Sequence, residues 1–205
     1  MDTKEADAAP KLMPVVATYG LPIETTTTVT PQSTLPLEMH AIVVCDTSPI
    51  RALAHLGLID LLREFFQLVL VPPAVAAELN NPASKVTPVS VGEFPFIRVR
   101  VPSDLDRVKQ FGDDPPRLHL GESEALALAL EVRADLVLID ENDGRKKVQE
   151  LGLVPLGVLG LLVRAKERGM IDEVTPLMHR LKHELKFYIS EIVWSKIILM
   201  TGELS

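Results

Sequence analysis

The sequence predicts an α/β layered fold with a parallel sheet, and two observations lead to this class. Short apolar, β-branched segments alternate with longer segments of helical periodicity, an order that is typical of strand–helix–strand units. The apolar segments are hydrophobic throughout rather than alternating, as expected for parallel strands that helices cover on both faces. The chain has 205 residues, of which 47% are hydrophobic and 24% charged. This is an ordinary globular composition, and we expect one compact domain at residues 41–205.

Residues 1–40 differ from the rest of the chain. They contain the threonine run Thr25–Thr28 and several prolines, and no helical or strand periodicity continues through them. We therefore predict a disordered Pro/Thr-rich tail. Met39 lies just before the first predicted strand, which leaves two interpretations open. Either the protein starts at Met39, or the tail is a genuine flexible extension.

Composition and charge exclude several classes of protein. The only cysteine, Cys45, excludes a disulfide framework or a cysteine-rich zinc site. No apolar run reaches the ~18–20 residues of a membrane span. Residues Met1–Lys11 are acidic and polar, unlike a secretory signal, so we expect a cytoplasmic protein. The net charge of −7 is uneven, because acidic side chains prevail in 41–143 and basic ones in 144–205. This distribution suits a carboxylate-lined metal site with cations nearby better than a simple nucleic-acid-binding surface.

Five short apolar segments are the predicted strands. The first ends at Asp46, and Pro72 and Pro73 stop the second. The fourth has the apolar residues Leu136–Ile139 between two aspartates. In order, the predicted strands are 41–45, 68–71, 97–101, 135–140 and 153–156.

Segments with apolar residues at helical spacing separate and follow these strands. Thr47 or Ser48 is suited to cap the first helix, with Pro49 in its first turn, and Ser190 is suited to cap the last. The clearest helix is 121–131, which is rich in strong helix formers. The predicted helices are 50–56, 59–65, 74–79, 103–111, 121–131, 142–151, 158–168, 173–185 and 191–200.

Carboxylates recur where these elements meet. Asp46 and Asp140 each follow a wholly apolar strand, and Glu141 is next to Asp140. In open α/β sheets, ligands bind beyond the carboxyl ends of the strands. Further acids lie on neighbouring helices, namely Glu78, Glu122 and Glu124.

Carboxylates that converge repel one another and lose solvation, so a hard cation is their usual partner. Mg²⁺ and Mn²⁺ prefer carboxylate and water oxygens, and such an ion can activate water and orient a phosphodiester for hydrolysis. The alternative is structural, since an acid in the first turn stabilises a helix dipole and an aspartate after a strand can cap the next helix. The carboxylates together indicate a metal site more specifically than any one of them does, because both aspartates end apolar strands.

Four segments resemble the motifs of PIN domains. The segment Val44–Ile50 is similar to their opening motif, an apolar strand followed by Asp-Thr/Ser-Ser. Val71–Leu79 resembles the second motif, in which Val-Pro opens a helix that carries an acid. Gly121–Ala129 resembles the helix of the third acid, and Leu138–Arg145 the fourth motif. The resemblance is specific because all four occur in the right order and spacing, and it extends to relatives of VapC-type toxins.

The resemblance implies a metal-dependent ribonuclease with a three-layer α/β/α fold and a central, mainly parallel sheet. Asp46, Glu78, Glu124 and Asp140 match the acidic quartet of the family. Of these, Asp46, Glu124 and Asp140 would bind one or two Mg²⁺ or Mn²⁺ ions, with Glu78 nearby. Glu122 is an extra or substitute ligand. The third acid is usually Asp in the family, and the longer Glu at this position changes the reach of the carboxylate. The supporting residues that the resemblance implies are Thr47, Ser48, Glu141 and Asp143.

Other residues have both a functional and a structural interpretation. Arg145 and Lys146, with Lys147, could hold a substrate phosphate or form a solvated helix face. The histidines are expected to be surface or packing residues, and Cys45 to be packing. For three aromatic residues near the C-terminus, Phe187, Tyr188 and Trp194, we expect core or partner-binding roles rather than base stacking.

The main hypothesis is therefore a PIN-type endoribonuclease that hydrolyses RNA with metal-activated water. By resemblance, the protein is also a candidate toxin of a toxin–antitoxin pair, a homodimer, and the target of a small antitoxin protein. One alternative is a catalytically weak or inactive module that binds a protein or RNA. Another is a small-substrate phosphatase, but Ser48 occupies the position where the haloacid-dehalogenase type needs a second Asp.

Overall fold

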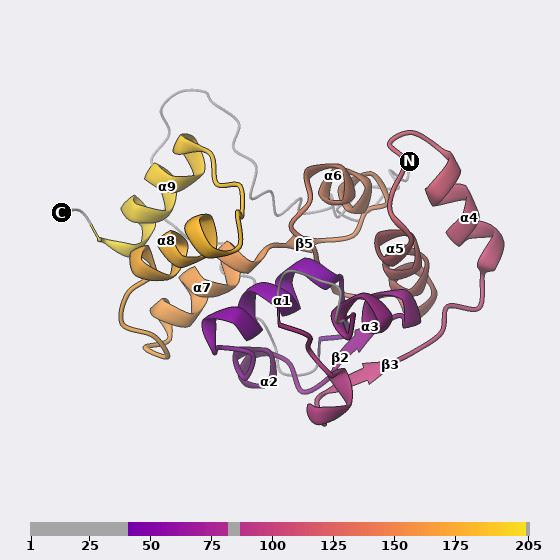
Figure 1. Ribbon diagram of the computed structural model, residues 1–205. Helices are drawn as coiled ribbons and strands as arrows, with labels where there is room; N and C mark the ends of the chain where they lie inside the picture. Colours follow the sequence, from indigo (N-terminus) through magenta and orange to yellow (C-terminus); the bar gives the residue numbers. More distant parts are fainter. Residues whose placement is uncertain (1–40, 82–86, 204–205) are drawn as a thin grey trace, which may run out of the picture. The chain divides into compact units, whose positions relative to one another are not determined.

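The computed structural model describes residues 41–81 and 87–203 (Figure 1). The tail predicted for residues 1–40 lies outside the described residues. None of the helices in the described ranges is long and apolar enough to cross a membrane.

A five-stranded sheet forms the centre of the described fold, with strand order β3-β2-β1-β4-β5. All pairings are parallel, which confirms the predicted class and extends its mainly parallel sheet to a wholly parallel one. The strands are short, and β4 pairs β1 and β5 only as far as Leu138. Their bounds are β1 (Val43–Cys45), β2 (Val69–Val71), β3 (Ile97–Val99), β4 (Leu136–Leu138) and β5 (Pro155–Leu156).

Helices cover both faces of the sheet, and successive strand residues face opposite layers. Val43 and Cys45 pack against one layer, which contains side chains of the first three helices and of the C-terminal helices. Val44 and Val137 pack against the other layer. The first layer consists of α1 (Thr47–Leu56), α2 (Leu61–Phe65), α3 (Pro73–Leu79), α7 (Val158–Glu167), α8 (Thr175–Glu184) and α9 (Glu191–Thr201). The second consists of α4 (Leu105–Asp113), α5 (Leu120–Val132) and α6 (Asn142–Glu150).

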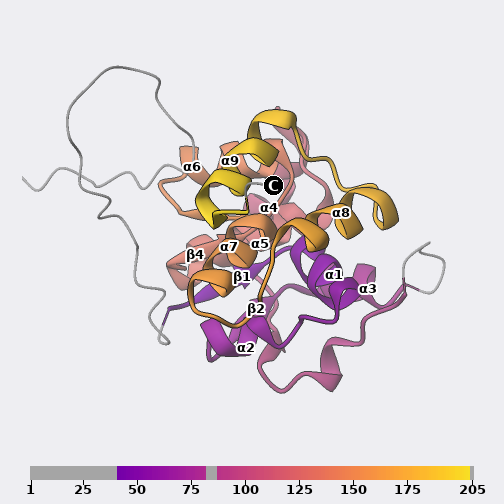
Figure 2. The same ribbon diagram turned by 90° about the vertical axis from the view of Figure 1, so that its left-hand side faces the viewer.

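Helices α7, α8 and α9 gather at one end of the described fold and face the viewer in Figure 2. The N-cap predicted at Ser190 is confirmed, because its hydroxyl accepts the Val193 N–H. The cap predicted at Thr47 or Ser48 is wrong. Asp46 occupies the capping position of α1, although its side chain makes no capping hydrogen bond, and the two hydroxyls bond to carboxylates instead. A short 3₁₀ turn, Val91–Glu93, lies in the connection to β3.

The strand order creates a switch point between β1 and β4. From β1 the chain proceeds through β2 to β3 on one side, and it returns to β4 and β5 on the other. The Asp46 N–H donates to the Leu138 carbonyl at 2.9 Å, which holds the ends of the two central strands together. Ligands of parallel sheets bind at such a point, beyond the carboxyl ends of the strands. Asp46 and Asp140 are therefore the acids that the topology places best.

Candidate active site

Only one of the two carboxylate oxygens of Asp140 has a hydrogen-bond partner among the described residues. Its Oδ1 accepts the N–H of Val158, the first residue of α7, at 2.9 Å. Its Oδ2 is buried and has no hydrogen-bond partner among the described residues. A buried carboxylate oxygen without a donor is costly, and a bound cation would remove that cost. This oxygen is therefore the atom of Asp140 that is best suited to contact a cation.

The two aspartates hold protons more tightly than ordinary carboxyl groups. The pKa of Asp46 is raised from 3.8 to about 7, chiefly by burial; the charges of Glu141, Glu122 and Glu78 contribute to this rise, and the Thr47 backbone hydrogen bond opposes it. The pKa of Asp140 is likewise raised from 3.8 to about 7, chiefly by burial; Glu141 and Asp46 contribute, whereas the Val158 N–H and Arg145 oppose the rise. The acids around Asp46 and Asp140 therefore share one electrostatic environment.

The hydroxyls after Asp46 connect acids from different elements. Thr47 Oγ1 donates to Glu78 Oε2 at 2.7 Å, which ties α1 to α3. Ser48 Oγ lies 2.8 Å from one oxygen of Glu141 and 2.9 Å from the other. It also lies 3.5 Å from Asp46 Oδ2. Both hydroxyls therefore position carboxylates around Asp46, which is compatible with the supporting role that we expected.

Helix α5 contributes two acids that face different neighbours. Glu122 Oε2 accepts the N–H of His119 at 2.9 Å, so this side chain also closes the first turn of its own helix. Burial raises the pKa of Glu122, and the charges of Glu141 and Asp143 raise it further against the His119 contacts. Glu124 Oε2 instead accepts the N–H of Ala74, near the start of α3, at 2.8 Å.

Three glycines leave room for the carboxylates. A Cβ on Gly157 would lie 2.7 Å from Asp140 Oδ1 and 3.0 Å from Arg145 Nη1. On Gly144 it would lie 2.8 Å from Glu122 Oε1, and on Gly121 3.0 Å from Glu78 Oε1. A larger residue would crowd Asp140 at position 157, Ile139 and Glu122 at position 144, and, more mildly, Glu78 at position 121. The sequence interpretation missed this role, although Gly157, directly before a helix and after the last strand, is a signal that could have indicated it.

The basic residues that the sequence indicated have different surroundings in the structure. Arg145 Nη1 donates to the Ile139 carbonyl at 3.1 Å, which holds its guanidinium beside Asp140. Lys146 lies 3.8 Å from Asp143 in an exposed pair on α6. Arg145 is thus placed to act at the site, whereas Lys146 and Asp143 lie on the solvated face of the helix.

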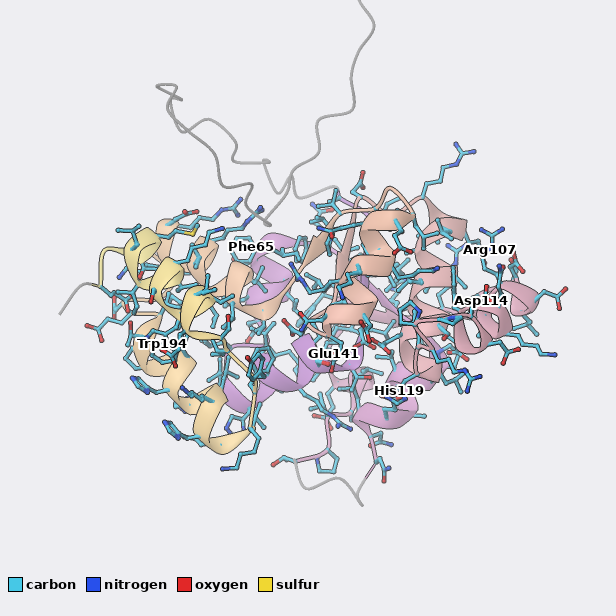
Figure 3. All side chains as sticks on the ribbon, turned by 90° about the horizontal axis from the view of Figure 1, so that it is seen from above. Phe65, Arg107, Asp114, His119, Glu141 and Trp194 are labelled. Carbon is cyan, nitrogen blue, oxygen red and sulfur yellow. The ribbon has the colours of Figure 1, made fainter. Side chains whose placement is uncertain are left out.

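An open cavity of about 470 Å³ adjoins the acids. Figure 3 shows Glu141 between the C-terminal helices, which carry Trp194, and the start of α5, which His119 marks. Asp140 and Glu141 line one side of the cavity, and the connection between α8 and α9 lines the other. Its lining residues include Ser48, Arg51, Asp140, Glu141, Lys186 and Tyr188.

The residues fit a divalent metal in donor chemistry, although they do not form a closed cage. Over residues 41–81 and 87–203, no three His, Cys, Asp or Glu groups stand close enough to hold an ion by themselves. Mg²⁺ commonly binds one or two carboxylates and completes its coordination with water and substrate oxygens. The buried Asp46 and the half-buried Asp140, whose Oδ2 is buried and unpartnered, match that requirement.

The surroundings of most of the remaining candidate residues indicate packing rather than catalysis. Cys45 is buried, and burial together with the charges of Asp46 and Asp140 raises its thiol pKa well above the usual value. The ring of His179 stacks on His183 and meets Trp194 edge-on. These contacts agree with the packing roles that we expected. Phe187 packs against the core, but Tyr188 is exposed.

Comparison with known families agrees with the fold. Residues 42–203 match the PIN domain family, and the chain belongs to that family. PIN domains are generally nucleases that use divalent metal ions and act on nucleic acid. No curated protein and no solved structure matches the chain significantly.

Proposed function

We propose that this protein is a metal-dependent endoribonuclease in which Asp46 and Asp140 hold Mg²⁺ or Mn²⁺. The observation that carries the proposal is the buried, unpartnered Oδ2 of the half-buried Asp140, close to the buried Asp46 at the switch point of the sheet. Such carboxylates are costly to ionise without a cation. When bound, the metal supplies a nucleophilic hydroxide near neutral pH and neutralises charge on the phosphate.

The chain's own residues would orient the reaction. Val158 holds Asp140 by its N–H, so that the opposite oxygen of the carboxylate points away from α7's backbone. Ser48 holds Glu141 at the rim of the cavity, where its exposed carboxylate can accept a proton from water. Arg145, held by the Ile139 carbonyl next to Asp140, can offset the negative charge there.

Helix α5 would complete the site through Glu122 rather than Glu124. The charge of Glu122 acts on Asp46, and Glu122 lies in the first turn of a helix that leads into β4. The N-terminus of that helix lies at the same edge of the sheet as the aspartates. Glu124, which matches the third acid by resemblance, would support the site indirectly, because its bond to Ala74 holds the helix that carries Glu78.

A second candidate is a PIN domain that binds a protein or RNA without cutting it. This alternative is favoured by one observation, that the acids do not gather into a closed metal cage within the described residues. The proposed toxin role, the small antitoxin protein, the homodimer and the cytoplasmic location are supported only by the resemblance to VapC-type toxins and by the composition. They depend on the nuclease activity being present.

Cleavage of a mixed, structured RNA pool tests the proposal. Wild-type protein is incubated with Mn²⁺, with Mg²⁺ or with EDTA, beside Asp46→Asn, Asp140→Asn and the exposed control Asp172→Asn. We expect cutting with either metal, none in EDTA, loss in both site variants and retention in the control. Cutting that persists in EDTA or in both site variants would contradict the proposal. Absence of both cutting and metal binding would favour the binding module.

A further inference from the structure

The wall of the cavity that faces the acids has no role in the proposed chemistry. It is the connection between α8 and α9, of which Leu185, Lys186, Phe187 and Tyr188 line the cavity. Across from it lie Asp140 and Glu141 at the end of β4, and Ser48 and Arg51 on α1. The connection is anchored at both ends, because the Phe187 N–H donates to the Leu181 carbonyl and Ser190 caps α9.

The side chain of Tyr188 lines this wall of the cavity and is largely exposed. The residue is 82% exposed, although its neighbour Phe187 packs against the core. Tyrosine usually covers part of its apolar surface in a folded protein. A ring left open beside a cavity is instead suited to stack on a flat partner, and nucleobases stack on aromatic side chains irrespective of their sequence.

Lys186 adds a cation in an unusual backbone conformation. It follows Leu185, the C-cap of α8, and has a φ of 57°. Glycine is the favoured residue at this position because a side chain is strained there. Lys186 nevertheless occupies this position and lines the cavity, and no salt bridge of Lys186 occurs within the described parts of the chain.

Arg51 supplies a second cation on the opposite wall. Its Nη2 donates to the Glu78 carbonyl, which fixes the guanidinium between α1 and α3. The acids of the site would repel a phosphate that approaches alone. Cations on both walls reduce that repulsion and give a nucleic acid backbone two contacts on either side of the cavity.

We propose that Lys186, Tyr188 and Arg51 form a nucleotide subsite for single-stranded RNA beside the acidic centre. The base of a nucleotide next to the cleaved bond stacks on Tyr188, while Lys186 and Arg51 contact its phosphates. The cavity of about 470 Å³ lies within the ~300–1,000 Å³ that small-molecule sites occupy. This inference deepens the proposed function and rests on it for the identity of the ligand.

Binding without turnover tests the subsite. The fluorescence anisotropy of a labelled, mixed-sequence, short single-stranded RNA is titrated with full-length protein in EDTA at low salt. The variants are Tyr188→Ala, Tyr188→Phe and Lys186→Gly. The control is Ile192→Ala, which removes another highly exposed apolar side chain, 78% exposed, that does not line the cavity.

We expect Tyr188→Ala to weaken binding by about ten- to a hundredfold, the effect of losing one stacked base, and Tyr188→Phe and Ile192→Ala to bind as the wild type does. Lys186→Gly should relieve the strained backbone, leave the melting temperature equal or higher, and reduce the slope of log affinity against log salt by about 0.7. Equal binding by Tyr188→Ala and wild type, or no binding by wild type, would overturn the subsite. Because no metal is present, Tyr188-dependent binding by a protein that fails to cut RNA would support the subsite and refute only the nuclease proposal.

Discussion

The N–H of Ala74 donates to Glu124 Oε2 at 2.8 Å, so the carboxylate of α5 closes the first turn of α3. The N–H groups of a first turn lack partners within their own helix, and a negative charge there also stabilises the helix dipole. Glu122, two residues earlier, bonds to His119 and acts electrostatically on Asp46. The two acids therefore have different surroundings, although they are close in sequence.

This difference predicts opposite outcomes for two matched variants. Glu122→Gln removes a charge near Asp46, so the melting temperature should rise less on addition of Mn²⁺ than it does in the wild type, corresponding to at least about tenfold weaker binding. Glu124→Gln keeps an oxygen for Ala74 and should change Mn²⁺ binding by less than about threefold, while lowering stability by about 0.5–1 kcal/mol. Thermal unfolding with and without Mn²⁺ measures both effects. The reverse order of metal sensitivity would identify Glu124 as the ligand.

The raised pKa values predict how metal-free stability depends on pH. Asp46 has a pKa of 3.8 in its ordinary state and about 7 when folded, and Asp140 behaves in the same way. The folded protein thus binds more protons than the unfolded chain between these values, so its free energy of unfolding falls as the pH rises through that window. Above it, Asp46→Asn should be more stable than wild type by about 1–3 kcal/mol, and below the lower pKa it should show no such gain.

Urea denaturation in EDTA across that pH range measures this dependence. If the free energy of unfolding of the wild type stays constant between pH 3.8 and about 7, the folded state does not raise the pKa values of the two aspartates. This result would contradict the prediction. The matched control is Asp172→Asn, an exposed aspartate whose substitution should leave the curve unchanged.

The glycine beside Asp140 predicts a purely steric effect. Gly157 has a φ of −94°, which alanine adopts freely, but a Cβ there would lie 2.7 Å from Asp140 Oδ1. Gly157→Ala should therefore displace this carboxylate and weaken Mn²⁺ binding by about tenfold or more, since overpacking of this kind costs about 1–3 kcal/mol. Isothermal titration with Mn²⁺ measures the loss. Gly92→Ala is the control, because a Cβ at Gly92 meets nothing within 4 Å; equal affinities in both variants would refute the steric argument.

The hydroxyl of Thr47 predicts a selective loss. Thr47→Val keeps the shape of the side chain but removes the 2.7 Å bond to Glu78, which should lower stability by about 0.5–1.5 kcal/mol. Thr47→Ser retains the donor and should preserve most of that bond. Chemical denaturation of the three proteins compares them. A valine variant as stable as the serine variant would mean that the hydrogen bond contributes nothing measurable.

The sequence was sufficient for the class of fold and for the central aspartates. Uniformly apolar strands such as that before Asp46 indicate burial on both faces, and an acid at the end of such a strand is conspicuous in the sequence alone. The family resemblance rested on the same short motifs, and the match over residues 42–203 confirmed it. Element boundaries were accurate to a few residues, because strand ends depend on pairing with neighbours rather than on local composition.

The side-chain partners could not be predicted, because they depend on distant residues. Nothing in the local sequence shows that Glu124 bonds to Ala74, or that the Val158 N–H holds Asp140. The same holds for Tyr188, for which the sequence favoured a core or partner-binding role, whereas the structure leaves it exposed at the cavity. Contacts across α1, α5 and the connection between α8 and α9 become visible only once the elements are packed.

The most direct test of the central claim is a calorimetric titration of the full-length protein with Mn²⁺, beside Asp46→Asn and Asp140→Asn. If the two aspartates hold the ion together, wild type should bind Mn²⁺ and release protons at a pH near the folded pKa of about 7. Each variant should lose measurable binding while remaining folded. Wild type that binds no Mn²⁺, or variants that bind it as tightly as wild type does, would contradict the assignment of Asp46 and Asp140 as the metal site.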